Sequence, residues 1–420
     1  MLIEWLSFVL IGVAALAIAA APGTPAELRT IRNLLVAGVF MRIVGVLARY
    51  SMIFDLYDGG SDAVGYFQTG SIIADHFRAL DFSIIGSGQF GQREWGTQAV
   101  RYASGVVQTF IGPSMRGAFL VFSLAAFLGL VCITVAFGRS SRSSSMQQAA
   151  LLLFFWPTLW FWPSSIGKEA TLLLAIGLVM LGYVGRGERI HWIPLAGGFA
   201  LALAVRPHLA GVLAISACVA EWTSRGWTPR RVAQSLVASA GALWLTIRAL
   251  ELLGLSGTDL ASMQEFVAYT GQQTYQGGSA FDRPTMAAAI PMSFINILCR
   301  PFITEANNGM ALASSLEMMA LWAIALLNLR NLKSVLQSWR SNRLLRFAIP
   351  FALLYILMIG LTFQNFGIIA RQRTLVMPAL LLLFAAKPVV AMRRARTVPT
   401  RRVWRNHEST ARPLAVRRMS

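Results

Sequence analysis

The sequence predicts an all-α protein, a polytopic bundle of about 11 transmembrane helices with external amphipathic helices. Composition is the first reason, because 56% of the 420 residues are hydrophobic and 13% are charged, whereas soluble proteins have about 45–50% and about 25%. Runs of roughly 20 apolar residues, the length that crosses a bilayer, also recur along the chain. So few polar side chains cannot cover a water-soluble fold, which excludes a cytosolic enzyme and a nucleic-acid-binding domain despite a net charge of +19.

The apolar segments that are expected to cross the membrane follow one another closely. They are 3–21, 33–50, 116–137, 148–163, 170–184, 191–206, 208–222, 232–254, 309–328, 347–364 and 374–392. The first carries Glu4 and has no basic flank before it, which favours a retained helix over a cleaved signal peptide. Pro207 separates two short segments and favours a tight hairpin between them. Residues 1–392 are accordingly interpreted as a single transmembrane domain.

The basic residues predict the orientation of these helices. With the N-terminus outside, every gap on the cytoplasmic side is rich in arginine, as the positive-inside rule requires. These gaps hold Arg29 and Arg32, Arg139 and Arg142, Arg186 and Arg189, Arg225, Arg230 and Arg231, and the segment 328–346. The last of these is predicted to be an amphipathic helix at the membrane interface. The tail, 393–420, is rich in arginine and is predicted to be disordered, cytoplasmic and held against anionic headgroups.

Two external segments, about 51–115 and 255–308, are too polar to span the membrane and too long to be simple connectors. The first begins with Asp55, Asp58 and Asp62, and the pair Gly59-Gly60 permits a tight turn between the last two. Residues 62–82 then predict an amphipathic helix with Ser61 or Asp62 as its N-cap. Most of the remaining acids also fall on this side, so the outer face is expected to combine acidic and basic groups.

Short external turns carry the basic groups of this face. They are Trp162-Pro-Ser-Ser-Ile-Gly-Lys168-Glu169, Arg206-Pro-His208, Arg300-Pro-Phe302 followed by Glu305, and Arg371-Gln-Arg373. Charges at helix ends near hydrocarbon are costly unless they are paired or face a wet cavity. Arginine binds phosphate oxygens through its planar fork of donors. The turns therefore predict a site for a polyanionic headgroup.

These turns, together with Asp62-Ala-Val-Gly-Tyr66, resemble the GT-C superfamily of polytopic membrane glycosyltransferases. The resemblance covers most of residues 30–392, and similar strings also occur in bacterial polysaccharide-polymerase-like membrane proteins. Here the long external loop follows the second span, whereas in the family it follows the first. The resemblance implies a polyprenyl-phosphate-linked sugar donor, used on the outer face of a bacterial cytoplasmic membrane, and a glycan or lipid-linked acceptor in cell-envelope assembly.

The resemblance also implies roles for individual residues. Asp62 is expected to be the catalytic base, with Asp58 as the second candidate. The groups expected to hold the donor phosphate are Lys168, Arg206, His208, Arg300, Arg371 and, as a second contact, Arg373. Glu169 and Glu305 are expected to support them. Asp55, Asp58 and Asp62 could share a divalent cation, but their spacing matches no calcium loop, so neither a metal site nor a cofactor is predicted.

Three other functions remain open at this point. A polysaccharide polymerase or ligase that moves a lipid-linked oligosaccharide would use the same cations, with an acceptor groove formed by 255–308. A flippase or transporter would favour charges inside spans, for which Arg42, Arg248, Glu251 and Glu317 are the candidates. A scaffold in an envelope complex would need no site. Cys132, Cys218 and Cys299 show neither disulfide nor zinc spacing.

Overall fold

The computed structural model describes residues 2–23, 25–90, 96–140, 143–186, 189–224, 228–253, 260–275, 280–281 and 286–386. Seventeen α-helices account for most of these residues, and the predicted all-α class is confirmed. The helices are α1 (Leu2–Ala20), α2 (Arg32–Ser51), α3 (Asp62–Arg78), α4 (Thr97–Ile111), α5 (Met115–Ser140), α6 (Ser143–Phe155), α7 (Pro157–Phe161), α8 (Lys168–Val184), α9 (Trp192–Val205), α10 (Pro207–Trp222), α11 (Pro229–Leu253), α12 (Leu260–Thr274), α13 (Met286–Leu298), α14 (Gly309–Leu327), α15 (Leu329–Ser338), α16 (Arg343–Thr362) and α17 (Phe366–Ala385). The predicted basic tail lies outside the described residues.

Five helical segments in the described ranges are long and apolar enough to cross a membrane. They are Arg29–Leu56, Met115–Ser140, Gly309–Leu327, Arg343–Thr362 and Phe366–Ala385. Several shorter apolar helices accompany them, including α9 and α10. The chain is therefore a multi-pass membrane protein, while the count of eleven spans and the orientation stay predictions.

Two predicted spans differ in detail from the helices that form. The segment 148–163 is divided into α6 and α7, because Trp156 adopts an extended backbone before Pro157, which occupies the first turn of α7. The last span begins at Phe366 instead of residue 374, since the Asn365 side chain caps α17 by accepting hydrogen bonds from Gly367 and Ile368. Arg371 and Arg373 consequently lie within a helix and not in the turn before it.

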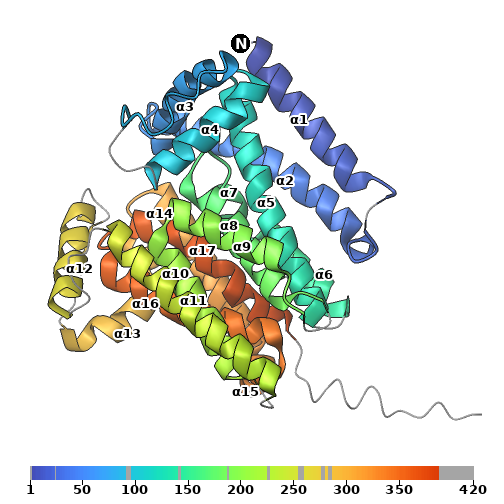
Figure 1. Cartoon of the computed structure of the whole chain (residues 1–420), viewed down its shortest axis with the longest axis vertical. Coiled ribbons are helices and arrows are strands. Elements are labelled where there is room, and N and C mark those ends of the chain that lie inside the picture. The colour runs from blue at the N-terminus through green and yellow to red at the C-terminus, as the bar shows by residue number, and fades with distance from the viewer. Residues whose placement is uncertain are drawn as a thin grey trace, which may run out of the picture.

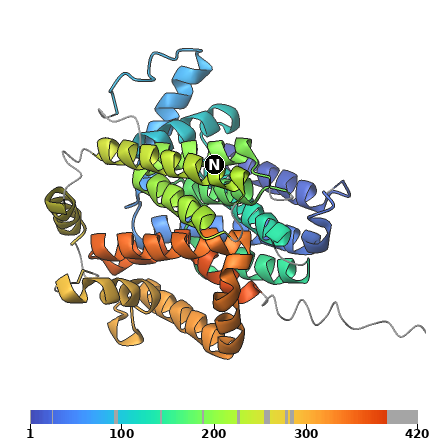
Figure 2. The same ribbon diagram turned by 60° about the horizontal axis from the view of Figure 1, so that its bottom comes forward.

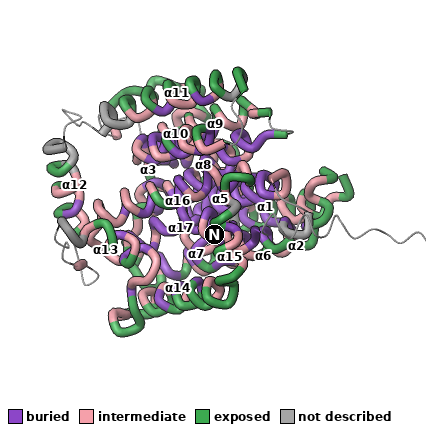
Figure 3. Tube along the Cα trace, turned by 90° about the horizontal axis from the view of Figure 1, so that it is seen from below, coloured by how far each residue is buried: buried purple, intermediate pink, exposed green. Residues whose placement is uncertain are grey.

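The centre of the bundle depends on glycines that let helix backbones touch. A Cβ atom at Gly129 of α5 would lie 2.3 Å from the carbonyl oxygen of Leu173 in α8, and one at Gly177 would lie 2.2 Å from the carbonyl of Gly129. Gly198 of α9 approaches Ala175 of α8 in the same way. Small residues at such crossings are the usual means of packing helices in a membrane. Figure 3 shows the buried residues concentrated in α5, α8 and α17.

The outer helices expose apolar side chains. Val13 on α1, Leu243 on α11 and Leu316 on α14 are each more than half exposed. Large apolar surfaces of this kind are unfavourable in water but suit contact with lipid chains. Figures 1 and 2 place α12 at the edge of the bundle, apart from the central helices.

The segment 51–115, which is predicted to be external, contributes the helical pair α3 and α4 at one end of the molecule, with α15 at the opposite end (Figure 1). Helix α3 begins as predicted, because the Ser61 hydroxyl accepts a hydrogen bond from the amide of Ala63. It ends at Arg78, four residues before the predicted end, and Leu80 then adopts a left-handed backbone conformation. A helix is present within the predicted segment 328–346, but it is shorter than predicted, because α15 ends at Ser338 and residues from Arg343 onward belong to α16.

Candidate functional site

Charged side chains from four segments meet at the end of the bundle where α3 begins. Arg371 Nη1 on α17 lies 3.2 Å from Asp62 Oδ2 on α3, and Arg371 Nη2 lies 2.9 Å from Glu169 Oε2 on α8. Glu169 Oε1 in turn lies 3.2 Å from Arg206 Nη2. We name these four residues and the adjacent Lys168 the charged cluster.

Local backbone geometry explains how Glu169 and Arg206 reach one another. Glu169 lies in the first turn of α8, where the helix dipole favours a negative charge. Arg206 ends α9 and precedes Pro207, so its backbone is extended and the chain reverses there into α10. The predicted hairpin break thus places the Arg206 side chain at the first turn of α8.

Gln372 and Tyr355 support the charged cluster from the interior of the bundle. The sequence analysis did not single out either residue as part of the site. Gln372 Oε1 accepts a hydrogen bond from Arg206 and another, at 3.0 Å, from the Tyr355 hydroxyl on α16. Both residues are buried. The only sequence signal for Gln372 was its position between Arg371 and Arg373. Its contacts join α9, α16 and α17 beneath the charged groups.

The cluster extends from solvent into the bundle. The Asp62 side chain is 65% exposed, whereas that of Glu169 is 3% exposed. Two carboxylates and three cations give a formal net charge of +1. The Lys168 ammonium is within electrostatic reach of the other four groups, and no hydrogen bond to it is found in the described part of the chain. Each arginine also has five N–H donors, so donors remain for a further anion.

Arg300 lies apart from the charged cluster and forms an ion pair with Glu305. Arg300 Nε lies 2.9 Å from Glu305 Oε1 and 3.0 Å from Oε2, and its guanidinium lies 4.3 Å from the centre of the Phe366 ring. Hydrogen bonds from Arg300 hold the pKa of Glu305 below its usual value of 4.5. Arg300 is thus already paired with a carboxylate and an aromatic face.

Arg373 has a different environment from Arg371, two residues before it. It is 1% exposed and donates hydrogen bonds to the carbonyl of Ile297 at 2.6 Å, to that of Asn296 at 3.2 Å and to that of Arg300. These carbonyls lie at and just beyond the end of α13, where helix carbonyls have no partner within the helix. The arrangement satisfies backbone acceptors in the bundle interior.

The remaining predicted residues, Asp58 and His208, lie outside the charged cluster. Asp58 is exposed, in a turn with a left-handed backbone, and within the described residues it makes no hydrogen bond or ion pair with the charged cluster. His208 is in the first turn of α10, within electrostatic reach of Arg206 and Lys168. Across the described ranges, no three His, Cys, Asp or Glu side chains come together as metal ligands.

Arg49 is a further cation that the sequence did not single out. Its position at the end of the predicted span 33–50 suggested a helix boundary. In the structure Arg49 is buried on α2, 5.0 Å from the ring centre of Trp162 and 5.4 Å from that of Phe161, and it is electrostatically coupled to Arg371 and Glu169. The aromatic residues before Lys168 therefore cover a fourth positive charge.

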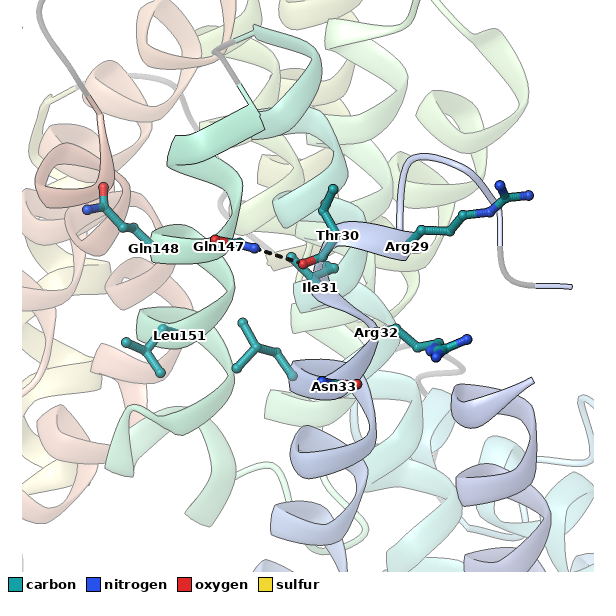
Figure 4. Close-up of a pocket in the computed structure, with 9 residues that line it drawn as sticks. Arg29, Thr30, Ile31, Arg32, Asn33, Gln147, Gln148 and Leu151 are labelled. Carbon is teal, nitrogen blue, oxygen red and sulfur yellow. Dashed lines mark hydrogen bonds between the residues drawn. The ribbon is translucent and has the colours of Figure 1, made fainter. Parts of the chain in front are cut away.

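A cavity of about 560 Å³ lies at the other end of α2, where that helix meets α6. Gln147 donates a hydrogen bond to the Thr30 carbonyl across it, and Figure 4 shows Arg29 and Arg32 extending to one side, away from α6. None of the predicted site residues lines this cavity.

Comparisons with known proteins add no support to the resemblance to the GT-C superfamily, which rests on the short motifs alone. No family model matches the chain, and neither a curated protein nor a solved structure matches it. Membership of the GT-C superfamily therefore stays a prediction.

Proposed function

We propose that the chain is a membrane glycosyltransferase that uses a polyprenyl-phosphate-linked sugar on the outer face of a bacterial cytoplasmic membrane, in the assembly of cell-envelope glycans. The observation that supports this function is the charged cluster, in which Asp62 of the first external segment meets Glu169, Arg206 and Arg371 from three other segments. The charged cluster thus brings one exposed carboxylate, that of Asp62, next to several cations.

The exposed carboxylate suits proton removal from an acceptor. In the proposed reaction the acceptor oxygen bonds to the anomeric carbon of the donor sugar, while the bond from that carbon to the phosphate oxygen breaks. The acceptor proton passes to Asp62, and polyprenyl phosphate leaves with the bonding electrons. The ion pair with Arg371 orients the Asp62 carboxylate, whose exposure leaves it accessible to an acceptor from outside.

The cations suit the departing phosphate. Glu169 holds Arg206 and Arg371 in fixed positions before a ligand arrives, and preorganised donors of this kind stabilise a developing negative charge without reorganisation. The Lys168 ammonium adds three donors beside them. We assign the donor phosphate to Lys168, Arg206 and Arg371 first. Arg300, which is paired with Glu305, is assigned a secondary role.

The test is turnover by the purified full-length chain with radiolabelled polyprenyl-phosphate sugars and candidate acceptors. We expect Asp62→Asn to lower turnover by about 10²–10⁴-fold, the usual contribution of a general base. Asp58→Asn is the matched control, because Asp58 is exposed and lies outside the cluster, and it should retain most activity. Full turnover by Asp62→Asn would exclude this residue as the base, and loss in Asp58→Asn alone would reassign the role.

Two further outcomes separate the alternative functions. Movement of the labelled lipid across proteoliposomes without any covalent change would favour a flippase over a transferase. Transfer of a whole oligosaccharide in place of one sugar would favour a polymerase or ligase. Labelling of a Ser61→Cys variant only from the cytoplasmic side would overturn the proposed location of the cluster.

A further inference from the structure

A charged pocket lies at the end of the bundle opposite the charged cluster, on the side that the arginine distribution predicts to be cytoplasmic. Its volume is about 280 Å³, and its lining includes Arg139 at the end of α5, Arg343 and Arg346 at the start of α16, Glu221 near the end of α10 and Gln234 on α11. None of these residues belongs to the charged cluster.

The basic side chains of this pocket are largely buried. Arg139 is 16% exposed and lies 2.9 Å from Glu27, while Arg343 is 13% exposed. Arg343 Nη2 lies 3.9 Å from Glu221 Oε1, which is too far for a hydrogen bond. Three arginines against Glu221 and Glu27 leave an excess of positive charge, which suits an anion.

Several polar atoms around the pocket have no hydrogen-bond partner. Within the described residues, two of these are the buried Nε atoms of Arg139 and Arg346. Buried polar atoms normally find partners, because leaving them unpaired is unfavourable. The two Nε–H groups need acceptors, such as phosphate oxygens.

An apolar groove adjoins this pocket. Its volume is about 430 Å³, and it runs between α9, α10 and α11. Glu221 and Gln234 line both spaces, so the polar pocket continues into the groove. Large apolar side chains such as Phe199 and Leu245 form its walls, while small residues such as Ala217 and Gly241 leave the room between them.

We propose that the pocket and the groove form one binding site for an anionic phospholipid. The phosphate lies among Arg139, Arg343 and Arg346, and one acyl chain follows the groove. Charge complementarity selects this occupant, because a neutral or cationic headgroup would leave the arginines uncompensated. The arginine-rich tail of the chain carries the wrong charge to occupy the pocket. The site is independent of the proposed transferase activity.

The test is the binding of lipids and phosphate to the full chain in detergent, measured by native mass spectrometry. Phosphatidylglycerol, phosphatidylcholine and inorganic phosphate are the probes. We expect phosphatidylglycerol to bind more tightly than phosphatidylcholine by about tenfold or more, the effect of roughly one charge-assisted contact. Arg346→Gln should weaken the binding of phosphatidylglycerol by a similar factor. Equal binding of the two lipids would overturn the proposal.

Variants of the groove distinguish a lipid from a free anion. A Cβ atom at Gly241 meets no atom within 4 Å, so Gly241→Leu fits and fills the groove, and it should weaken lipid binding while leaving phosphate binding unchanged. Gly197→Leu is the matched control, because Gly197 is equally open but does not line the groove. Tight binding of inorganic phosphate with no effect of Gly241→Leu on the lipid would show a site for soluble anions and refute the lipid assignment.

Discussion

Glu169 provides the sharpest test of how the charged cluster is held together. Its buried carboxylate bridges Arg206 at 3.2 Å and Arg371 at 2.9 Å. Glu169→Gln keeps the size of the side chain but removes its charge, which leaves Arg206 without a carboxylate partner and Arg371 with only the exposed Asp62. Removing one partner of a buried ion pair destabilises a protein by about 3–5 kcal/mol.

We therefore expect Glu169→Gln to lower the free energy of unfolding by about 3 kcal/mol or more. Asp62→Asn is the matched comparison, because it removes the exposed end of the same network, and exposed pairs contribute about 0.2–1 kcal/mol. Equilibrium unfolding by denaturing detergent in mixed micelles measures both. Equal stability of Glu169→Gln and the parent chain, or an equal loss in both variants, would refute the view that the buried carboxylate organises the cluster.

Three further predictions concern other parts of the structure. Gly129→Ala places a methyl group against the backbone of α8 and should lower the free energy of unfolding by about 1–3 kcal/mol. Gly197→Ala is the control and should not, because a Cβ atom at Gly197 meets no atom within 4 Å. Thermal unfolding of the two variants measures the difference. Arg373→Met leaves buried carbonyls without a donor and should reduce the yield of folded protein in size-exclusion chromatography. Arg371→Ala, by contrast, should fold but lose turnover. Equal yields of the two variants would contradict the structural role of Arg373. The Arg300–Glu305 pair lowers the pKa of Glu305, so it stabilises the fold above pH 4.5 and the benefit is lost as the pH falls through the lowered pKa. The stability difference between the parent and Arg300→Gln should accordingly be largest at neutral pH and shrink below pH 4.5, and a constant difference would exclude this linkage.

The sequence predicted the helical class because apolar runs of membrane-spanning length are a strong local signal. It placed the start of α3 correctly, since a serine N-cap acts within a few residues. It misplaced the start of α17, because Arg371, Gln372 and Arg373 resemble a polar turn until their partners on other helices are known. The division between α6 and α7 was missed for a similar reason, since the surrounding residues remain apolar across Pro157.

The candidate site was predictable as a set of residue types but not as a set of contacts. Asp62 and Arg371 are 309 positions apart, and only the tertiary fold, which brings the start of α3 within ion-pair distance of α17, joins them. The distinction between Arg371 and Arg373 depends on the side of α17 that each occupies. Arg49 could not be recognised because its burial follows from aromatic residues more than a hundred positions away.

The glycine contacts between α5, α8 and α9 also limit how the molecule can move. Where backbones touch, a helix cannot slide along its axis without driving the next side chain into its neighbour, so these three helices behave as a rigid frame. A long lipid that enters the bundle must therefore be admitted by displacement of peripheral helices such as α11, α12 or α14. Crosslinks that tie α5 to α8 should then leave ligand exchange unaffected, whereas crosslinks that restrain the periphery should slow it.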